Sequence, residues 1–446
     1  MNKQKQKYNI WTIGCQMNTA DSRHLANCLE GFGYEFTDNA DEANLVVLNT
    51  CVVRASAENK VNGKLQYMQG LKKHRPEIKI ALMGCFVGRG KNTALREQFP
   101  FVDIFLPPSD ISPIIEHLDE FAPPREQQEE PPLSCTSKMN DSGHLALPAS
   151  AGNAVSANVP AVLGCSHACT YCIIPYRRGR EHSRPRTEIL KEVRSLTLQG
   201  VKEIILLGQI VDRYGADSDS EYDLADLLRD TAAIDGVERV RFLTSHPGYM
   251  TDRIISAIAE EEKICPHFEL PCQSGSDKIL TQMRRGYTAD EFSRLVSNIR
   301  RRIPSAAINT DIIVGFPGET DAHFIESYRL AEELRFDTIH IAKYSPRPQT
   351  YAARHLPDNV PEEEKERRRK MLDNLQNTIL TENNALLLGK TVDVLVDGKT
   401  RKNQRWRGRT PQNKIVFFED SSNQLGQIVS VKIKWTGPFS MIGNKI

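Results

Sequence analysis

The sequence has no apolar run of 18 residues or more, and it has no marked excess of charge of either sign. The first absence excludes a transmembrane helix, because about 20 consecutive apolar residues are needed to cross a bilayer. The net charge of +1 excludes a strongly basic protein that coats nucleic acid, although it leaves room for a local basic patch. No apolar segment follows the basic N-terminal residues, so we expect no signal peptide and a cytoplasmic protein.

What the sequence does contain is cysteine, with ten residues among 446. In a reducing compartment this content indicates metal or redox chemistry rather than disulfides. At about 150 residues per domain, the chain is long enough for about three domains. One stretch, residues 122–158, has few apolar residues and is rich in proline, glutamate and small residues. It predicts a linker, with an irregular loop inside one domain as the alternative.

Three strand-like segments in the N-terminal part each end at a cysteine. They are residues 8–13 with Cys15, residues 45–50 with Cys51, and residues 78–83 with Cys85. The connections are long enough for right-handed βαβ crossovers, so we expect parallel strands. Parallel strands bring their carboxyl ends to one edge of an open sheet, where such sheets bind ligands. The pattern predicts a metal site on these cysteines, whereas Cys28 has the helical spacing of a small core residue.

A second group of cysteines has a much more specific spacing. Cys165, Cys169 and Cys172 form a C-x3-C-x2-C pattern, with Tyr171 directly before the last cysteine. Three thiolates at this spacing suit three irons of a 4Fe-4S cluster and leave the fourth iron open. A structural zinc site is the alternative, but it needs a fourth protein ligand. His167 lies inside the spacer, a poor place from which to close a tetrahedron.

The spacing resembles the signature of the radical S-adenosylmethionine superfamily. The resemblance implies that the amine and carboxylate of S-adenosylmethionine bind the open iron. One-electron reduction then cleaves the sulfonium and gives a 5′-deoxyadenosyl radical, while the protein positions the partners and excludes water.

The residues that follow alternate between strand and helix patterns. Strands are expected at 160–163, 203–207, 239–243, 267–270, 307–314 and 338–344, and helices at 188–198, 224–232, 251–259 and 289–301. Six βα units predict an open (βα)6 barrel with its reactive groups at the carboxyl ends of the strands. Each polar residue there could be a turn residue, but together they favour a site. The predicted cofactor-binding residues are Tyr171, Gln209, Ser245, Gln273, Ser274 and Asp311.

The charged segment 361–370 predicts the start of a helix with a solvated face. Beyond it, β-rich runs at 391–396, 414–418 and 427–435 suggest a small antiparallel barrel. Residues 390–446 contain eleven Lys or Arg and four Asp or Glu, so this tail is basic. Basic side chains around an exposed tryptophan suit RNA, and a solubilising loop is the alternative. The candidate RNA contacts are Arg401, Lys402, Arg405, Trp406, Arg407 and Arg409.

The order of these parts resembles the methylthiotransferases, whose tail domain is the RNA-binding TRAM barrel. Within them, several motifs look like the MiaB-type tRNA enzymes: GCQMN at 14–18, NTCVVR at 49–54, CTYCIIPYRRG at 169–179, SRP at 183–185, QSGS at 273–276 and DIIVGFPGET at 311–320. The resemblance implies an N-terminal α/β domain at 1–121, the linker at 122–158, a radical barrel at 159–385 and a TRAM barrel at 386–446. Two positions depart from the family pattern: Ile210 replaces an asparagine, and Cys272 replaces a small apolar residue.

The resemblance also implies a reaction, the attachment of a methylthio group to carbon 2 of isopentenyl-modified adenosine next to the anticodon. Two 4Fe-4S clusters would take part, with one S-adenosylmethionine methylating sulfur at Cys15, Cys51 and Cys85 and another supplying the radical. The expected partners are a tRNA anticodon stem-loop and a flavodoxin- or ferredoxin-like electron donor, and the protein is expected to be a monomer away from membranes.

Three alternatives stay open at this point. A sister methylthiotransferase would act on threonylcarbamoyl-adenosine or on a ribosomal protein aspartate, but the triplet Gln16-Met17-Asn18 argues against both. A different radical enzyme would use the N-terminal cysteines for electron relay. An RNA-binding protein with structural zinc sites would perform no reaction.

Overall fold

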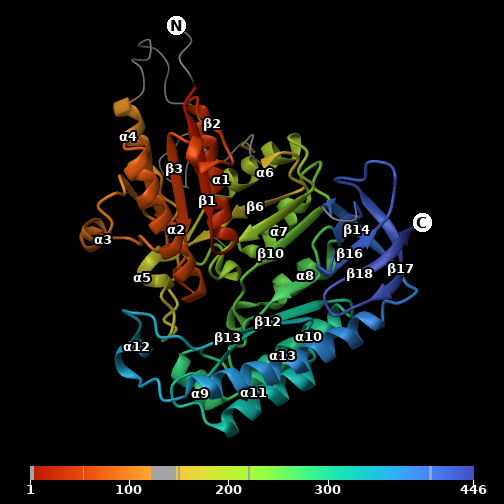
Figure 1. The fold of residues 1–446 in the computed structure, drawn as a ribbon. Helices are drawn as coiled ribbons and strands as arrows, with labels where there is room; N and C mark the ends of the chain where they lie inside the picture. Colours follow the sequence, from red (N-terminus) through yellow and green to blue (C-terminus); the bar gives the residue numbers. More distant parts are fainter. Residues whose placement is uncertain (1–4, 54, 122–146, 149–150, 219–220, 401–403) are drawn as a thin grey trace. The chain divides into compact units, whose positions relative to one another are not determined.

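The computed structural model describes residues 5–53, 55–121, 147–148, 151–218, 221–400 and 404–446 (Figure 1). The predicted linker lies for the most part outside these residues, and its bounds stay a prediction. The chain divides into two compact units. Unit 1 comprises Met1–Asn153, Asn158–His167 and Cys172–Gln199, and unit 2 comprises Ala154–Ala157, Ala168–Tyr171 and Gly200–Ile446. In the described part of the chain, no helix is long and apolar enough to cross a membrane.

Unit 1 is built on a five-stranded sheet in the order β2-β1-β3-β4-β5, and all its pairings are parallel. The strands are β1 (Lys7–Thr12), β2 (Glu35–Phe36), β3 (Leu45–Thr50), β4 (Lys79–Gly84) and β5 (Ile104–Leu106). The connecting helices are α1 (Gln16–Gly31), η1 (Ala40–Glu42), α2 (Ala55–His74), α3 (Thr93–Gln98) and α4 (Ser112–Phe121). The predicted parallel arrangement of the three cysteine-terminated strands is therefore confirmed.

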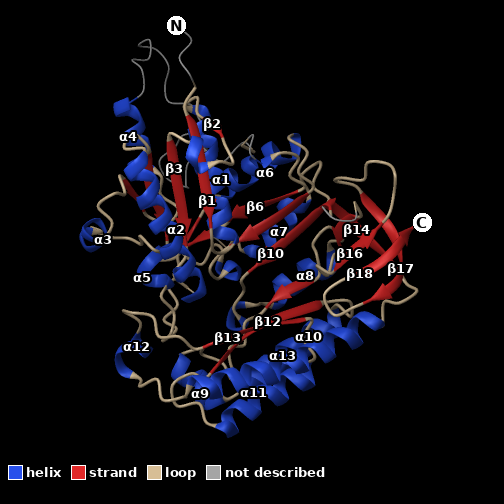
Figure 2. Ribbon diagram, viewed as in Figure 1, coloured by secondary structure: helices blue, strands red, loops and turns tan. Residues whose placement is uncertain are grey.

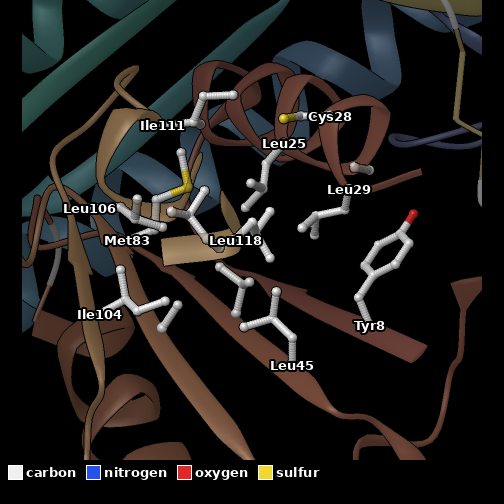
Figure 3. Packing of buried hydrophobic residues seen from close by; sticks show 14 residues of the cluster. Tyr8, Leu25, Cys28, Leu29, Leu45, Met83, Ile104, Leu106, Ile111 and Leu118 are labelled. Atoms are coloured by element: carbon white, nitrogen blue, oxygen red, sulfur yellow. The ribbon is translucent and has the colours of Figure 1, made fainter. Parts of the chain in front are cut away.

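Every residue of the central strand β3 is buried, because helices cover both faces of the sheet. Leu45 and Val47 pack with residues of α1 and α4, and the alternate residues Val46 and Leu48 pack with residues of α2. Figure 3 shows the first of these clusters, which includes Cys28 on α1. The prediction that Cys28 is a core residue is confirmed.

The later part of unit 1 follows the sheet in sequence. It contains α5 (Ile174–Arg178), α6 (Arg186–Leu198), and the antiparallel pair β7 (Val162–Leu163) and β8 (His182–Ser183). The strand expected at 160–163 is interrupted, since β6 (Ser156–Pro160) ends at Pro160 and β7 begins after Ala161. Proline has no N–H to donate to a strand ladder, which explains the break.

Unit 2 contains the predicted barrel strands. They are β9 (Glu203–Leu207), β10 (Arg239–Leu243), β11 (His267–Glu269), β12 (Ala307–Val314) and β13 (Thr338–Lys343). The pairs β9–β10, β11–β12 and β12–β13 are parallel, and an isolated parallel bridge from Val240 to Ile264 links β10 to the segment before β11. With β6 beside β9, six strands follow one another in the predicted order.

Helices alternate with these strands (Figure 2). They are η3 (Val211–Arg213), α7 (Leu224–Ala232), η4 (Pro247–Tyr249), α8 (Asp252–Glu260), α9 (Asp277–Met283), α10 (Ala289–Arg302), α11 (Asp321–Leu334), α12 (Tyr351–His355) and α13 (Glu362–Ala385). Capping boxes begin three of them, with Asp223 before α7, Thr288 before α10 and Thr320 before α11. Such side chains satisfy backbone N–H groups that have no partner inside the first turn.

The first turns of α13 correct one expectation. Lys365 and Arg368 were predicted to lie on a solvated face, but both are buried. The Lys365 ammonium lies 2.7 Å from the Asp358 carboxylate, and the Arg368 guanidinium lies 2.7 Å from the Glu319 carboxylate. A charged side chain is buried at lower cost where an opposite charge and hydrogen bonds meet it, and a charge run in the sequence does not reveal such partners.

The C-terminal residues of unit 2 form a closed barrel in the order β14-β15-β16-β18-β17. Its strands are β14 (Thr391–Lys399), β15 (Trp406–Arg409), β16 (Ile415–Phe418), β17 (Ile428–Thr436) and β18 (Met441–Lys445). The predicted small barrel is confirmed, although one pairing, β16 with β18, is parallel. The sequence patterns did not identify β15 and β18, which are short and contain glycine.

Candidate functional site

The three N-terminal cysteines follow neighbouring parallel strands of unit 1. Cys15 is the N-cap of α1 just after β1, and Cys51 and Cys85 directly follow β3 and β4. Cys15 is exposed, whereas Cys51 and Cys85 are buried. β3 pairs in parallel with both β1 and β4, so the cysteines that follow these strands lie at one edge of the sheet. The geometry thus brings these predicted metal ligands to one edge of the sheet.

Two glycines make this edge tight. Gly84, with φ +96°, has no room for a side chain, because a Cβ atom would lie 2.5 Å from the carbonyl oxygen of Thr50. A Cβ atom on Gly14 would lie 2.9 Å from the Cβ atom of Cys51. Glycine therefore allows the strand ends to approach one another closely.

A buried network of amides supports the cysteine edge. The Asn18 side chain donates to Asn49 Oδ1 at 2.8 Å and to the carbonyl oxygen of Thr50 at 3.0 Å. Its Oδ1 atom lies 3.3 Å from Cys15 Sγ. Asn49 donates in return to the backbone carbonyl of Asn18 at 2.8 Å. These hydrogen bonds fix the start of α1 against the end of β3.

Arg178, at the end of α5, reaches the same edge with a buried guanidinium. It donates to Ser109 Oγ at 3.1 Å and to both Asn18 Oδ1 and Asp21 Oδ2 at 3.3 Å. Burial raises the pKa of the Cys85 thiol to about 11, and the positive charge of Arg178 opposes this rise. Sequence analysis did not single out Arg178, because its partners are distant in the sequence.

The chemistry of this donor set fits an iron–sulfur cluster. Thiolates are the ligands that such clusters take, and each thiolate of a 4Fe-4S cluster binds a different iron. The ligands of a single ion must stand closer together, and in the described part of the chain no group of three His, Cys, Asp or Glu has that arrangement. Arg178 adds a cation close to a group that would carry net negative charge.

The C-x3-C-x2-C segment belongs to both units, with Cys165 and Cys172 in unit 1 and Cys169 in unit 2. Gly164 precedes it with φ +69°, and a Cβ atom there would lie 2.1 Å from the carbonyl oxygen of Arg180. The backbone N–H of Cys165 donates to the carbonyl oxygen of Gly179 at 3.0 Å. This hydrogen bond joins the residues before the motif to those after it. Cys165 is buried, and Cys169 and Cys172 are half-buried.

In unit 2, Arg285 lies beside the middle cysteine of this motif. Its Nη1 atom is 3.3 Å from Cys169 Sγ, and its Nε atom donates to the Tyr287 hydroxyl at 3.1 Å. The guanidinium also donates to the backbone carbonyl of Pro271 at 3.0 Å and is almost fully buried. A buried cation is thus held within hydrogen-bond distance of the Cys169 sulfur. Sequence analysis missed Arg285, and no spacing signal pointed to it.

The predicted cofactor-binding residues of unit 2 differ in their surroundings. Ser245 is buried, and its hydroxyl has no hydrogen-bond partner among the described residues. The Ser274 hydroxyl lies 3.2 Å from Ser327 Oγ and accepts from the backbone N–H of Ser276, also at 3.2 Å. The Ser245 hydroxyl thus lacks a partner among the described residues, while that of Ser274 is bonded within the fold.

The other predicted residues lie on or after strands of the barrel, except Tyr171, which lies in the cysteine segment. Gln273 has φ +68°, a strained conformation for a residue with a side chain, and exchanges backbone hydrogen bonds with β12. Asp311, half-buried on β12, helps to raise the pKa of Glu269 to about 7, after the larger effect of burial. Gln209 is half-buried after β9, and the Tyr171 ring packs edge-on against Phe316 at 6.4 Å.

A buried pair that sequence analysis did not assign follows β9 and β10. The carboxylate of Asp212 accepts from the backbone N–H of His246 at 2.9 Å and 3.2 Å. Burial raises the pKa of Asp212 to about 7, although the hydrogen bond from His246 opposes the rise. The His246 ring lies 5.5 Å from that of Tyr287, which connects the pair to Arg285.

The two departures from the family pattern are both buried. Ile210, between β9 and η3, has an apolar side chain, which cannot make the polar contacts of an asparagine at this position. Cys272 donates from its backbone N–H to Thr310 Oγ1 at 2.9 Å, and its thiol points to the carbonyl oxygen of Asp311 at 3.6 Å. Burial raises the pKa of the Cys272 thiol to about 12.

The basic strand β15 corrects the expectation of an exposed tryptophan. Trp406 is 5% exposed, lies in the core of the C-terminal barrel and donates from Nε1 to the carbonyl oxygen of Asp420 at 3.1 Å. Alternation along the strand turns Arg407 outward, where it pairs with Asp397 at 2.7 Å. Arg405 pairs with Glu419 at 2.9 Å. The remaining candidates are Arg409, which donates to Asn413 at 3.0 Å, and Arg401 and Lys402, which lie outside the described residues.

Three family descriptions match successive parts of the chain. The Uncharacterized protein family UPF0004 matches residues 7–107, the Radical SAM superfamily residues 159–331, and the TRAM domain residues 385–446. The first two matches each contain one group of three cysteines, and the third contains the closed barrel.

Two solved structures have a similar fold. The radical S-adenosylmethionine methyltransferase TsrM from Kitasatospora setae, with cobalamin and a 4Fe-4S cluster bound, has a TM-score of 0.56 at 14% identity, covering 78% of this chain and 77% of that one. The cobalamin-dependent S-adenosylmethionine radical enzyme OxsB has a TM-score of 0.51 at 10% identity, covering 83% of this chain and 55% of that one. At these identities the likeness shows the fold alone.

Two curated relatives are similar over nearly the whole chain. A protein of Roseiflexus sp. (strain RS-1) is 45% identical over 445 residues, covering 98% of this chain and 89% of the relative. A protein of Chloroflexus aurantiacus is 44% identical over 443 residues, covering 98% and 91%. Both are named tRNA-2-methylthio-N(6)-dimethylallyladenosine synthase. This chain is a radical S-adenosylmethionine enzyme and belongs to the family of these synthases.

Proposed function

We propose that this protein attaches a methylthio group to carbon 2 of N6-dimethylallyladenosine, the isopentenyl-modified adenosine next to the anticodon of tRNA. The presence of two cysteine groups in one chain carries this proposal. A radical reaction alone needs one such group, and the cysteines at the sheet edge of unit 1 would then have no purpose. The names of relatives that are 42–45% identical support the same substrate.

We assign one 4Fe-4S cluster to Cys165, Cys169 and Cys172 and a second to Cys15, Cys51 and Cys85, with S-adenosylmethionine as the cofactor. When bound, the first cluster and S-adenosylmethionine supply the radical that removes the hydrogen atom on carbon 2. Three thiolates at each site leave one iron open.

The residues of the chain hold and orient these groups. Arg285 donates to the sulfur of Cys169 and so orients this ligand. The hydroxyl of Ser245, which has no partner among the described residues, supplies a hydrogen bond to the cofactor, and Asp311 on β12 and Gln209 after β9 supply further polar contacts. Tyr171, next to Cys172 in sequence, packs on the apolar cluster that contains Phe316 and so fixes its part of the loop.

The basic C-terminal barrel is the proposed contact with the tRNA anticodon stem-loop. Arg407 and Arg409 lie on β15, Arg405 directly precedes it, and all three bear charge suited to phosphates. Base stacking on Trp406 is not part of the proposal, because its ring lies in the core. Arg401 and Lys402 are further candidates. The protein is proposed to work as a cytoplasmic monomer with a flavodoxin- or ferredoxin-like electron donor.

Mass spectrometry of tRNA nucleosides tests the function directly. Cells that lack the gene should lose an adenosine species that carries both the dimethylallyl group and an added methylthio group. The intact gene should restore this species, and a gene with Cys169→Ala should not. Loss of a methylthio-threonylcarbamoyl species instead would identify a sister enzyme, and colourless protein containing zinc after anaerobic purification would indicate an RNA-binding protein without the reaction.

A further inference from the structure

Arg178 occupies an unusual position for a residue that follows a radical motif. It ends α5, six residues after Cys172 in the sequence, yet its guanidinium lies within unit 1 at the edge that carries Cys15, Cys51 and Cys85. It is 5% exposed. Ile173, the N-cap of α5, packs with Cys85 and Val52, so α5 begins beside this edge.

The contacts of Arg178 go beyond a simple ion pair. The guanidinium donates to Asp21, Asn18 and Ser109, and it interacts with the Cys85 thiol. Its Nε–H is buried and has no acceptor in the described part of the chain. A thiolate or sulfide is an acceptor that would satisfy such a donor.

The negative charge at this edge of the sheet is stabilised by a nearby cation. Asp21 is 1% exposed and Ser109 donates to it at 2.8 Å, so Arg178 already faces one buried carboxylate. Three thiolates and a cluster would add further negative charge, and reduction would add one electron. Inside a protein, a positive charge in contact with such a group stabilises its more negative state.

We propose that Arg178 is a positioning residue for a cluster on Cys15, Cys51 and Cys85, where it fixes the Cys85 thiolate and raises the cluster's reduction potential. The inference rests on the proposed function, since it requires a cluster at these cysteines. It assigns to the segment after the radical motif a second purpose, the electrostatic control of the other cysteine site.

The test uses the full-length chain with Cys165, Cys169 and Cys172 changed to Ala, so that only one cluster is present. Arg178→Gln removes the charge and most of the donors, while Arg178→Lys keeps the charge. Arg180→Gln, at an exposed position two residues away, is the matched control. Iron content, the electron paramagnetic resonance spectrum of the reduced protein and the midpoint potential are measured for each.

We expect Arg178→Gln to lower the midpoint potential by about 59 mV or more, which is a tenfold change in the one-electron equilibrium. Arg178→Lys should retain most of the potential but lose its iron faster to a chelator, because an ammonium lacks the guanidinium fork. Arg180→Gln should change neither value. An unchanged potential in Arg178→Gln, or an equal fall in Arg180→Gln, would overturn the inference.

Two further outcomes are decided by the same proteins. If Arg178→Gln does not fold, Arg178→Lys decides the matter, and resistance to the chelator equal to that of the parent protein would overturn the inference. The iron content of the parent protein tests the cluster assignment separately: no iron there contradicts the proposed function, whereas iron with an unresponsive potential contradicts only the assignment of Arg178.

Discussion

Ser245 and Ser274 look equivalent in the sequence, since both follow a strand of the barrel, but their hydroxyls have different surroundings. That of Ser245 is buried and has no hydrogen-bond partner in the described part of the chain, and that of Ser274 is bonded to Ser327 and Ser276. We expect Ser245→Ala to weaken S-adenosylmethionine binding about two- to tenfold, the worth of one hydrogen bond, without loss of thermal stability. Ser274→Ala should lower the melting temperature instead. Titration of the cofactor and thermal unfolding distinguish the two, and the opposite pattern would contradict the assignment.

Substitution of Cys272 tests whether cysteines outside the two groups of three also bind iron. Cys272 belongs to neither group of three cysteines, and its buried thiol points to the carbonyl oxygen of Asp311 at 3.6 Å. We therefore expect Cys272→Ser to retain the full iron content, while Cys169→Ser loses one cluster. Iron and sulfide analysis of both variants measures this. Loss of a cluster from Cys272→Ser would mean that the site assignment is wrong.

Asp212 predicts a dependence of stability on pH. Its pKa is raised by burial from 3.8 to about 7. Between about pH 4 and pH 7 the unfolded side chain is ionised while the folded one keeps its proton, so its contribution to stability falls as pH rises and levels off above pH 7. The stability of the wild type relative to Asp212→Asn should therefore decrease from about pH 4 to about pH 7 in thermal unfolding and change little above that. Asp235→Asn, an exposed control, should show no such trend.

At the scale of elements, a buried ion pair holds α13 against the segment that follows β12 in the central barrel. Arg368 pairs with Glu319, whose carboxylate also accepts from the backbone N–H of Gly315 at 2.5 Å. Because Arg368→Ala leaves a buried carboxylate unpaired, we expect a loss of about 3–5 kcal/mol of stability. Arg367→Ala removes only exposed ion pairs and should cost about 0–1 kcal/mol. Urea denaturation compares them, and equal effects would show that the buried pair does not stabilise this contact.

The elements themselves were largely predictable from local patterns. The strands at 203–207, 239–243 and 307–314 were predicted with their observed bounds, because apolar runs there lie between clear turn signals. The predicted ends of the N-terminal strands also placed Cys15, Cys51 and Cys85 correctly at one edge of the sheet. Local patterns could not reveal that Arg178 and Arg285 reach cysteines far away in sequence, or that Trp406 faces a core, since these depend on packing between distant segments.

At the scale of the whole molecule, the C-terminal barrel is tied to the rest of unit 2 through backbone groups. Arg241 pairs with Glu203 at 3.1 Å and donates to the carbonyl oxygen of Pro411 at 2.9 Å. Arg239 donates to the carbonyl oxygens of Arg409 and Asp393. Removal of the chain from Leu388 onward would take away these carbonyl acceptors, and Arg241 would keep only its ion pair with Glu203. Truncation would therefore disturb the central barrel, to which β10 belongs, as well as the RNA contacts. Side-chain substitutions in the C-terminal barrel are the cleaner test of RNA binding.

Substitution of Arg405, Arg407 and Arg409 by Ala leaves the carbonyl groups that Arg239 requires in place, so the fold should persist. Each arginine that contacts a phosphate releases counterions from the RNA, and the logarithm of affinity falls with the logarithm of salt concentration accordingly. We expect the triple variant to bind tRNA more weakly, with a salt dependence flatter by roughly one unit of slope for each lost contact. Cofactor cleavage without tRNA should not change.

The carboxylates on the same surface refine this expectation. Glu419 and Asp397 pair with Arg405 and Arg407 in the free protein, so phosphate binding must compete with these ion pairs. Glu419→Gln should therefore bind tRNA more tightly than the wild type at low salt. Arg294→Ala, on exposed α10, serves as the control and should leave the slope unchanged. If the triple variant keeps the salt slope of the wild type, the phosphates are bound elsewhere, and the basic strand of the barrel does not hold the tRNA.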